Sequence, residues 1–328
     1  MNYKLIPKGQ PIRICFLGCG NITQRHAKLI SKSGQQVALS FASRSIEKAE
    51  DYKKKFSGAF AYASYEEAIK SDDQDVIMIN TPPHIHFELA EFAVGHDKHL
   101  IVEKPPFFKS ADFDVIGKIA DKKGLHFMVA ENYYYKPLRK KVQETLESGL
   151  IGDPLFLHIN ATKIQESKKD WREDPEITGF GALFEGGIHW INFINNLGFD
   201  IKEIRGYVPG PKTVLERSIQ VIANTEQGVV MNLLYSWEVN TIFKGLRRSK
   251  VYGRDGSLTF ETNGIFAFLR GKKTKLMFPG LSNISGAAPM IDDFLGVIRE
   301  GRDPQFTWKM AQRDLELIEE IYASMEDK

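Results

Sequence analysis

The sequence has few of the features that mark secreted, membrane or metal-binding proteins. It contains two cysteines in 328 residues, Cys15 and Cys19, too few for a disulfide framework or a cysteine-rich metal site. No apolar run reaches the roughly 18 residues that span a bilayer. The N-terminal stretch MNYKLIPKGQPIRI shows no apolar core followed by a small-residue cleavage site. We therefore expect a soluble, cytoplasmic protein.

An excess of charge of either sign is also lacking. Forty-four basic and 42 acidic residues leave a formal net charge of +2, which gives no reason to expect nucleic acid or a membrane as partner. The His, Asp and Glu residues show no convincing metal-ligand spacing, so we predict no metal site. At 42% hydrophobic and 26% charged, the chain is globular, and its length suits two domains.

A buried strand, a glycine turn and a helix are predicted between Ile12 and Ile30 (IRICFLGCGNITQRHAKLI). Gly18 permits a tight turn, and Gly20 lets backbone N–H groups approach a pyrophosphate. The start of the helix offers unpaired N–H groups and a positive dipole end to an anion. Thr23 occupies the place of the third glycine of the usual fingerprint. The residues predicted to bind the cofactor phosphates are Gly18, Gly20, Asn21 and Ile22.

Helical patterns then alternate with short apolar runs as far as residue 130. Strands are predicted at 36–42, 59–62, 75–80, 99–102 and 125–130, and helices at 46–56, 65–70, 84–95 and 110–123. With the opening strand, this makes six strands separated by helices. Such an order predicts an α/β, doubly wound parallel sheet, a Rossmann dinucleotide-binding domain over residues 1–130.

The end of the second strand bears on the choice of cofactor. An NAD-binding unit usually places Asp or Glu there to bind the ribose 2′-hydroxyl. This chain has Ser43 and Arg44 instead, and a hydroxyl with a guanidinium suits a 2′-phosphate. We predict NADP in preference to NAD. The alternative is that Arg44 is only solvated, or stacks on the adenine of either cofactor.

Two later strand ends also point to the ligand crevice, which lies outside the carboxyl ends of parallel strands. The fourth strand ends in Thr81-Pro82, with His86 soon after, and the fifth ends in Glu103-Lys104-Pro105-Pro106. A lysine between a carboxylate and two prolines is an unusual composition for a turn. The alternative is that Lys104 is a surface cation in a rigid connection.

Residues 131–328 change from alternating units to long runs rich in β-branched and aromatic residues. These predict strands at 155–162, 218–224, 229–238, 249–253, 258–262 and 265–270, and turns at 226–228, 254–256 and 263–264 are hairpin signals. We predict an α+β domain with a large, mostly antiparallel, open-faced sheet. It would serve for substrate binding and oligomerisation.

The second half also holds a candidate acid–base pair. Residues 179–197 are predicted to be a loop feeding a helix, and Glu185 and His189 share a face at i and i+4 if the helix begins early enough. A carboxylate beside an imidazole fixes its tautomer and raises its basicity. The alternative for His189 is a satisfied core histidine. Trp171 and Arg172 either line the mouth of the substrate site or merely pack there.

Taken together, these motifs resemble the glucose–fructose oxidoreductase / inositol dehydrogenase (Gfo/Idh/MocA) family, over nearly the whole chain. The residues that carry the resemblance are 18–22 with His26, 81–82 with His86, 103–105, 130–133 with Pro137, 149–152, 171–172, 181–189, 292–294 and 316–322. The family pattern of Asp, three residues, then His has Glu185 at the Asp position. At a further position, three residues after that His, the family has Asp and this chain has Asn192.

The resemblance implies NAD(P) in the first domain and a sugar, sugar nucleotide or cyclitol between the domains. It also implies that Lys104 lies beside the nicotinamide, that the peptide before Pro105 is cis, and that the open sheet face forms a homodimer or homotetramer.

The predicted activity is NAD(P)-dependent hydride transfer to or from a hydroxyl or keto carbon. The catalytic residues would be Lys104, His189 and Glu185, and the substrate-binding residues Lys104, Trp171, Arg172, Glu185 and His189. Ser43, Arg44, Thr81, Pro82, His86, Glu103 and Lys104 complete the predicted cofactor site. The alternatives are an NAD-dependent, redox-assisted glycoside hydrolase and a non-catalytic NADP(H)-binding regulator.

Overall fold

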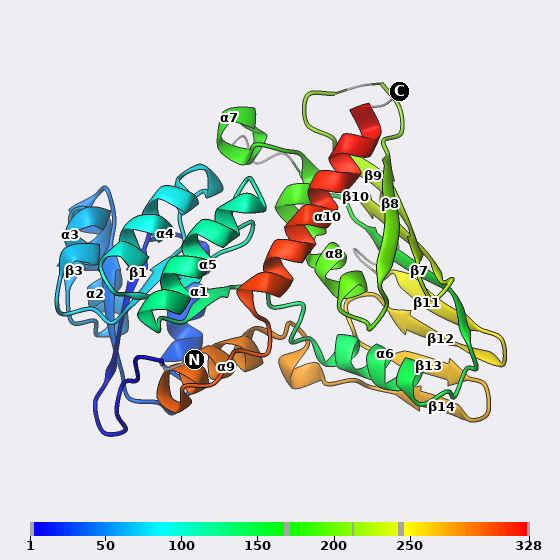
Figure 1. The fold of residues 1–328 in the computed structure, drawn as a ribbon, viewed down its shortest axis with the longest axis horizontal. Helices are drawn as coiled ribbons and strands as arrows, with labels where there is room; N and C mark the ends of the chain where they lie inside the picture. Colours follow the sequence, from blue (N-terminus) through cyan, green and yellow to red (C-terminus); the bar gives the residue numbers. More distant parts are fainter. Residues whose placement is uncertain (1–2, 167–170, 212, 242–245, 327–328) are drawn as a thin grey trace. The chain divides into compact units, whose positions relative to one another are not determined.

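A computed structural model describes residues 3–166, 171–211, 213–241 and 246–326 (Figure 1). The chain forms two compact units, residues 1–131 with 288–312 and residues 132–287 with 313–328. The break after residue 131 lies close to the boundary predicted at 130. Residues 288–312 also belong to the first unit, which the order of the predicted elements along the chain did not indicate.

The first unit is built on a six-stranded sheet in the order β3-β2-β1-β4-β5-β6, with every pair parallel. Its strands are β1 (Ile12–Leu17), β2 (Val37–Ala42), β3 (Ala61–Tyr62), β4 (Val76–Ile79), β5 (His99–Val102) and β6 (Phe127–Val129). Its helices are α1 (Asn21–Ile30), α2 (Ile46–Phe56), α3 (Tyr65–Lys70), α4 (His86–Gly95), α5 (Ala111–Lys123) and nearly all of α9 (Ala287–Glu300). Every residue of β4 and β5 is buried, as expected of strands covered on both faces. The predicted doubly wound sheet is confirmed.

Arg299 of α9 explains why residues 288–312 join this unit. Its Nη1 donates to the carbonyl oxygens of Ile6 (3.1 Å) and Pro7 (2.6 Å), and its Nη2 donates to that of Gln10 (2.8 Å). A guanidinium can satisfy several carbonyl groups at once because its donors are fixed in a fork. One side chain thereby ties α9 to the N-terminal segment that precedes β1.

The second unit contains an eight-stranded sheet in the order β14-β13-β12-β11-β7-β10-β9-β8. Its strands are β7 (Pro154–Thr162), β8 (Ile201–Tyr207), β9 (Ser218–Thr225), β10 (Val230–Ser236), β11 (Arg248–Gly253), β12 (Gly256–Glu261), β13 (Ala267–Arg270) and β14 (Thr274–Met277). Its helices include α6 (Pro137–Glu147), α7 (Pro175–Thr178), α8 (Ile188–Asn195) and most of α10 (Trp308–Glu326). The pairing is antiparallel except between the central strands β7 and β10. The predicted α+β unit with a mostly antiparallel sheet is therefore confirmed, although sequence reasoning missed β8 and β14.

The two faces of this sheet differ in exposure. On β7, Leu157 and Ile159 are buried, whereas the intervening Phe156 is 52% exposed. Exposed apolar side chains continue across the same sheet at Tyr252, Phe268 and Leu276. Figure 1 shows α6 and α8 on one side of the sheet. The other face keeps large apolar groups in contact with solvent, which is uncommon for a purely solvated surface.

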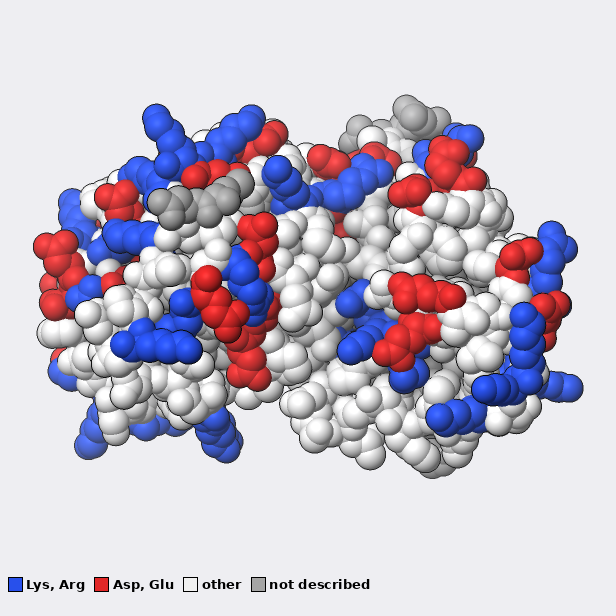
Figure 2. Space-filling view, turned by 60° about the horizontal axis from the view of Figure 1, so that its bottom comes forward, with Lys and Arg blue, Asp and Glu red and all other residues white. Residues whose placement is uncertain are grey.

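The surface shows mixed charge on the face in view, where Lys and Arg are interspersed with Asp and Glu (Figure 2). Across the described ranges, no helix is long and apolar enough to cross a membrane. Among those same residues there is also no group of three or more His, Cys, Asp or Glu placed to hold a metal ion.

Three aromatic rings stack in the first unit, and one of them belongs to the N-terminal segment. Tyr3 stacks on His126 with centroids 4.1 Å apart, and His126 lies 5.3 Å from His99. The backbone N–H of His126 donates to His99 Nδ1 at 3.0 Å. Burial lowers the pKa of His99 to about 3 and the pKa of His126 to about 4. Both imidazoles are therefore neutral in the folded protein at neutral pH.

This stack predicts an acid-sensitive fold. The unfolded histidines have pKa values near 6.5, so below that pH the unfolded chain binds more protons than the folded chain. We expect the free energy of unfolding to fall by about 2 kcal/mol for each histidine between pH 7 and pH 5. Urea unfolding at the two pH values measures it. His126→Phe should remove about half of the difference; an undiminished pH dependence in that variant would contradict the assignment.

Candidate functional site

The glycine turn after β1 has the geometry that an anion-binding turn needs. Gly18 adopts φ +102°, and a Cβ there would lie 3.0 Å from the Asn80 carbonyl oxygen, so both conformation and space require glycine. At Gly20, no heavy atom of the described chain lies within 4 Å of the place of a Cβ. Gly20 is also the N-cap of α1 and has no side chain to bind the first N–H groups of the helix. The turn therefore fits a dinucleotide pyrophosphate.

Thr23 has a specific function in this turn. It is fully buried, its Oγ1 donates to the Gly18 carbonyl oxygen at 2.6 Å, and it accepts from Asn80 Nδ2 at 2.9 Å. The hydroxyl ties the glycine turn to the end of β4. A glycine at this position would allow close packing of helix and strand but could not supply these two bonds. In this chain the hydrogen bonds of Thr23 thus hold the turn in place of the close packing that a third glycine would allow.

Ser43 and Arg44 follow β2 at the same carboxyl edge of the sheet. Ser43 is buried, and its Oγ accepts from the Ser45 N–H at 3.3 Å, whereas Arg44 is exposed. Burial raises the pKa of the nearby Tyr65 hydroxyl, and the positive charge of Arg44 partly offsets that rise. A cation beside a phenol at this edge suits a 2′-phosphate. The NADP preference stays a prediction.

Lys104 lies in a loop whose backbone is held by a buried carboxylate. The Lys104–Pro105 peptide is cis, as the resemblance implied. Glu103 is buried; His26 Nε2 donates to its Oε1 at 2.5 Å, and the Lys104 backbone N–H donates to its Oε2 at 3.0 Å. Burial alone would raise the pKa of Glu103, but His26 and Lys104 outweigh it and the pKa is lowered. An ionised Glu103 therefore anchors the backbone of Lys104.

His86 joins this loop to the one after β4. It is 1% exposed, its Nε2 lies 2.7 Å from the Thr81 carbonyl oxygen, and its Nδ1 lies 3.1 Å from those of Pro105 and Pro106. These contacts are with backbone, so they support a role in holding Thr81-Pro82 beside the lysine loop. Direct contact of His86 or Glu103 with the cofactor stays a prediction.

In the second unit, Glu185 lies in a π-helical turn, Leu183–Gly187, that leads directly into α8. Arg172 Nε donates to Glu185 Oε1 at 3.1 Å. The guanidinium of Arg172 also lies over the Trp171 ring, 4.4 Å from its centroid. The structure therefore brings together three of the residues predicted to bind substrate. The predicted helix begins at Ile188 as α8, and Glu185 lies before it in a wider turn of a kind that often marks functional sites.

His189, in the first turn of α8, stacks on a tyrosine that sequence reasoning did not assign to the site. The rings of His189 and Tyr133 are 4.3 Å apart and within 10° of parallel, and Trp190 meets Tyr133 edge-on at 5.1 Å. The buried Lys136 places its Nζ 4.4 Å from the centre of the Tyr133 ring. The motif AENYYYKP, directly after the last Rossmann strand, was the available signal. His189 is half-buried, and its role as acid–base group or as a satisfied core histidine stays a prediction.

Tyr235 is a second residue missed in the sequence. It is 3% exposed, and its hydroxyl accepts from Trp237 Nε1 at 2.8 Å. A Cβ on Gly186 would lie 2.3 Å from that hydroxyl, so glycine beside Glu185 allows β10 to approach the π-helical turn. Burial, and then the charge of Glu185, raise the pKa of Tyr235. Tyr235 is therefore a neutral phenol next to the candidate acid–base segment.

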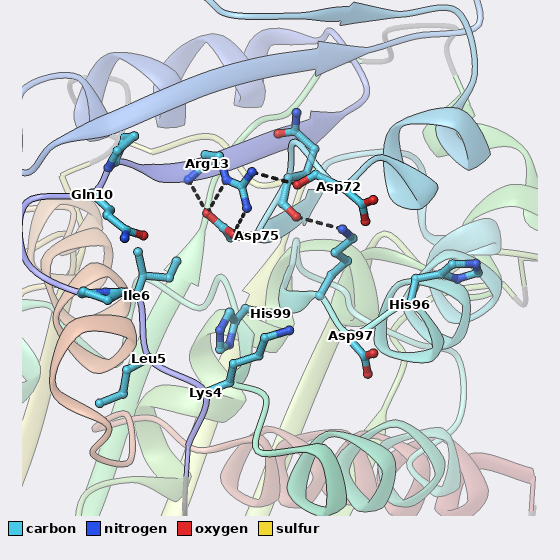
Figure 3. A pocket seen from close by; sticks show the side chains of 14 residues that line it. Lys4, Leu5, Ile6, Gln10, Arg13, Asp72, Asp75, His96, Asp97 and His99 are labelled. Carbon is cyan, nitrogen blue, oxygen red and sulfur yellow. Dashed lines mark hydrogen bonds and ion pairs between the residues drawn. The ribbon is translucent and has the colours of Figure 1, made fainter.

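A cavity of about 640 Å³ elsewhere in the first unit contains none of the predicted site residues. It opens where β1, β4 and β5 begin, at the edge opposite the glycine turn. Within it, Arg13 Nη2 pairs with Asp75 Oδ1 at 2.5 Å (Figure 3). Lys98 Nζ donates to the Gln74 carbonyl oxygen at 2.8 Å. The cavity lies apart from the predicted cofactor site.

Comparison with known proteins agrees with this architecture. Residues 12–131 match the family described as "Oxidoreductase family, NAD-binding Rossmann fold", and residues 140–259 match the "GFO/IDH/MocA C-terminal domain". D-xylose 1-dehydrogenase [NADP(+)] of Haloarcula marismortui is 28% identical over 190 residues, 56% of this chain and 53% of the relative. The chain thus matches about half the length of that relative.

A second relative and a solved structure extend the similarity. The dTDP-3,4-didehydro-2,6-dideoxy-alpha-D-glucose 3-reductase of Streptomyces violaceoruber is 28% identical over 256 residues, 76% of this chain and 72% of the relative. The structure of levoglucosan dehydrogenase in complex with NADH and levoglucosan shares the fold, with a TM-score of 0.86, 18% identity and coverage of 97% of this chain and 98% of that chain. Because the two family models together cover most of the sequence, the protein belongs to the Gfo/Idh/MocA family of oxidoreductases.

Proposed function

We propose that the protein is an NADP-dependent oxidoreductase that transfers a hydride between nicotinamide and a CH–OH or keto carbon of a sugar, sugar nucleotide or cyclitol. The observation that carries the proposal is the edge formed by β1, β4 and β5, which are neighbours in the sheet. The open glycine turn, the Thr81 loop and the anchored Lys104 follow these three strands. A phosphate-binding turn and a lysine with an anchored backbone at one edge suit a redox site for a dinucleotide.

The relatives support the substrate class. One is named for D-xylose and NADP(+), another for a dTDP-linked deoxyhexose, and the structurally similar levoglucosan dehydrogenase was solved with a sugar derivative. All three molecules are sugars or sugar derivatives. The half-buried pair of Arg172 and Glu185, with the Trp171 ring beside it, offers donors, an acceptor and a flat apolar surface for such a molecule.

We propose distinct roles for three residues. When bound, the nicotinamide supplies or accepts the hydride. Lys104 donates a hydrogen bond to the reacting oxygen and stabilises the negative charge that develops there. His189 takes the hydroxyl proton in oxidation and returns it in reduction. Glu185 supports the charged form of His189 and, through Arg172, holds the substrate side of the segment.

The cofactor preference predicts a selective effect at Arg44. Arg44→Ala should raise the Kd of NADPH about tenfold to a hundredfold, because a charge-assisted bond contributes about 1.5–3 kcal/mol. The Kd of NADH should stay nearly constant, since NADH carries no 2′-phosphate. Fluorescence titration of both cofactors measures this. Tighter binding of NADH than of NADPH by the wild type would overturn the preference.

The activity is tested by identifying what the purified protein retains and turns over. Mass spectrometry of small molecules released on denaturation should find NADP(H). A panel of sugars and cyclitols should then give a change in NADPH absorbance with at least one compound. A bound cofactor with hydrolysis of a glycoside and no net absorbance change would favour the hydrolase alternative. Cofactor binding with no turnover of any kind would favour the regulator.

We also propose that the open face of the eight-stranded sheet binds a second copy of the chain. Phe156 and Leu276 are 52% and 54% exposed on that face, and Tyr252 and Phe268 lie between them across the sheet. Sedimentation velocity should give the mass of a dimer or tetramer. A single-chain mass over the whole concentration range would refute the proposal.

A further inference from the structure

The start of the segment that bears Glu185 and His189 is held by a buried carboxylate. Glu216 is 7% exposed and lies just before β9. Its Oε1 accepts from the Leu183 N–H at 2.8 Å, and its own carbonyl oxygen accepts from the Ala182 N–H at 2.7 Å. The first N–H groups of a helix lack partners within the helix. Glu216 satisfies two of them from outside, with side chain and backbone together.

The approach of Glu216 explains a glycine in the same segment. A Cβ at Gly181 would lie 1.9 Å from Glu216 Oε2 and 2.5 Å from the Glu216 carbonyl oxygen. Any side chain at position 181 would therefore push the carboxylate away. Gly181 belongs to the GALFEGGIH motif, and the close approach of Glu216 requires glycine at this position.

The C-terminal part of α10 completes the support of this end. Tyr322 donates from its hydroxyl to Glu216 Oε1 at 2.9 Å, and its ring stacks on Phe180 at 4.8 Å. Burial raises the pKa of Glu216, while the bonds from Leu183 and Tyr322 oppose that rise. The carboxylate is thus enclosed and its position is defined by several donors.

The same helix also holds the other end of the segment. Asp314 of α10 is 2% exposed; its Oδ2 accepts from Asn192 Nδ2 at 2.6 Å, and its Oδ1 accepts from Asn195 Nδ2 at 2.8 Å. Asn192 and Asn195 lie in the last turns of α8. Carboxylates therefore hold segment 183–195 at two places, one before Glu185 and one after His189. The bonds described above join these carboxylates to other residues of the segment.

We propose that Glu216, Tyr322 and Asp314 are positioning residues that fasten segment 183–195 at both ends and so set the direction in which Glu185 and His189 point. This inference rests on the function proposed for that pair. Catalytic groups must be held closely, since a misplacement of about 1 Å can cost about a hundredfold in rate. Buried charged hydrogen bonds at both ends of a short segment provide such a constraint.

Glu216→Gln and Asp314→Asn keep the size of each side chain and remove the charge. In Glu216→Gln a neutral amide oxygen replaces the carboxylate Oε1 that accepts from Leu183 and Tyr322, so both bonds weaken and the start of the segment should shift. We expect kcat to fall about tenfold to a hundredfold with the KM of NADPH unchanged. Tyr322→Phe, which removes one donor and keeps the ring, should fold normally and give a smaller loss of kcat.

The matched control is Asp293→Asn. Asp293 is 3% exposed in the first unit, where it accepts from Arg302 Nη1 at 2.6 Å and from the Gln305 N–H at 2.8 Å. It is an equally buried, charge-bonded carboxylate outside segment 183–195. The control should lower Tm and leave kcat at the wild-type value. Equal losses of kcat in the control and the clamp variants would overturn the proposal.

A readout independent of turnover separates this proposal from the proposed function. The imidazole proton signals of His189, assigned with His189→Gln, report its stacking on Tyr133. They should shift in Glu216→Gln and Asp314→Asn and stay fixed in Asp293→Asn. Shifted signals in a protein that turns over no sugar would refute the proposed function and uphold the clamp. Unshifted His189 signals in both clamp variants would overturn the clamp.

Discussion

Replacing Lys104 with methionine should lower kcat about a hundredfold to a thousandfold, the loss typical of removing one donor to a developing oxyanion. Methionine keeps the length and apolar stem of the side chain and removes the ammonium. The Kd of NADPH should change little, because we propose that the glycine turn and the N-terminus of α1 bind the pyrophosphate. Steady-state kinetics and fluorescence titration on one preparation give both values.

Lys109→Met is the matched control for this experiment. Lys109 is exposed and lies five positions further along the same connection between β5 and α5. It should keep wild-type kcat. Near-normal turnover in Lys104→Met would remove the ammonium from the mechanism, and an equal loss in both variants would show that the connection tolerates no change of charge.

Replacing His189 with glutamine should lower kcat about a hundredfold to ten-thousandfold, the range for loss of a general acid–base group. Glutamine can still pack against Tyr133 and form hydrogen bonds, but it cannot carry a proton between the reacting oxygen and solvent. The variant's pH–rate profile should lack the dependence on pH that proton transfer through His189 gives the wild type. Kinetics across a pH series measures both effects.

His96→Gln serves as the control for the second experiment. His96 ends α4, and its Nδ1 donates to the Phe92 carbonyl oxygen at 2.8 Å. It contacts no predicted site residue in these bonds, so its replacement should leave kcat and the pH profile unchanged. A His189→Gln enzyme with wild-type turnover would place the proton transfer on another group.

The parallel sheet could be predicted from sequence because its signal is local. Strands buried on both faces, such as β4 and β5, are written as continuous apolar runs, and each is separated from the next by a helix. The eight-stranded sheet was harder. Alternation identifies which residues of β7 and β10 share a face, but the parallel pairing of these two strands depends on contacts between distant segments.

The two missed strands lie at the edges of that sheet. β14 reads TKLM and has three exposed residues, and β8 reads IKEIRGY with charged residues along its outer positions. Charged and short edge strands discourage pairing with other chains. The same charges weaken the apolar alternation by which a strand is found in a sequence.

The candidate site shows the same division. Lys104 could be singled out in the sequence because its neighbours form an unusual turn after a buried strand, and its role stays a prediction. The pairing of Glu185 with Arg172 spans 13 positions of the chain, and the stacking of His189 on Tyr133 joins segments that are far apart in the chain. Glu216 stands alone between Leu215 and Arg217 with no motif around it. Only its burial and its bonds to Leu183 and Tyr322 point to the positioning role that we propose.

The central claim is that the ammonium of Lys104 and the imidazole of His189 act on one oxygen atom. The most direct measurement is a crystal structure of the wild type with NADP(H) and the sugar identified by turnover. The account predicts Lys104 Nζ and one ring nitrogen of His189 each about 2.7–3.2 Å from the same substrate oxygen. A complex in which these two side chains face different ligands, or in which only one reaches the reacting carbon's oxygen, would contradict it.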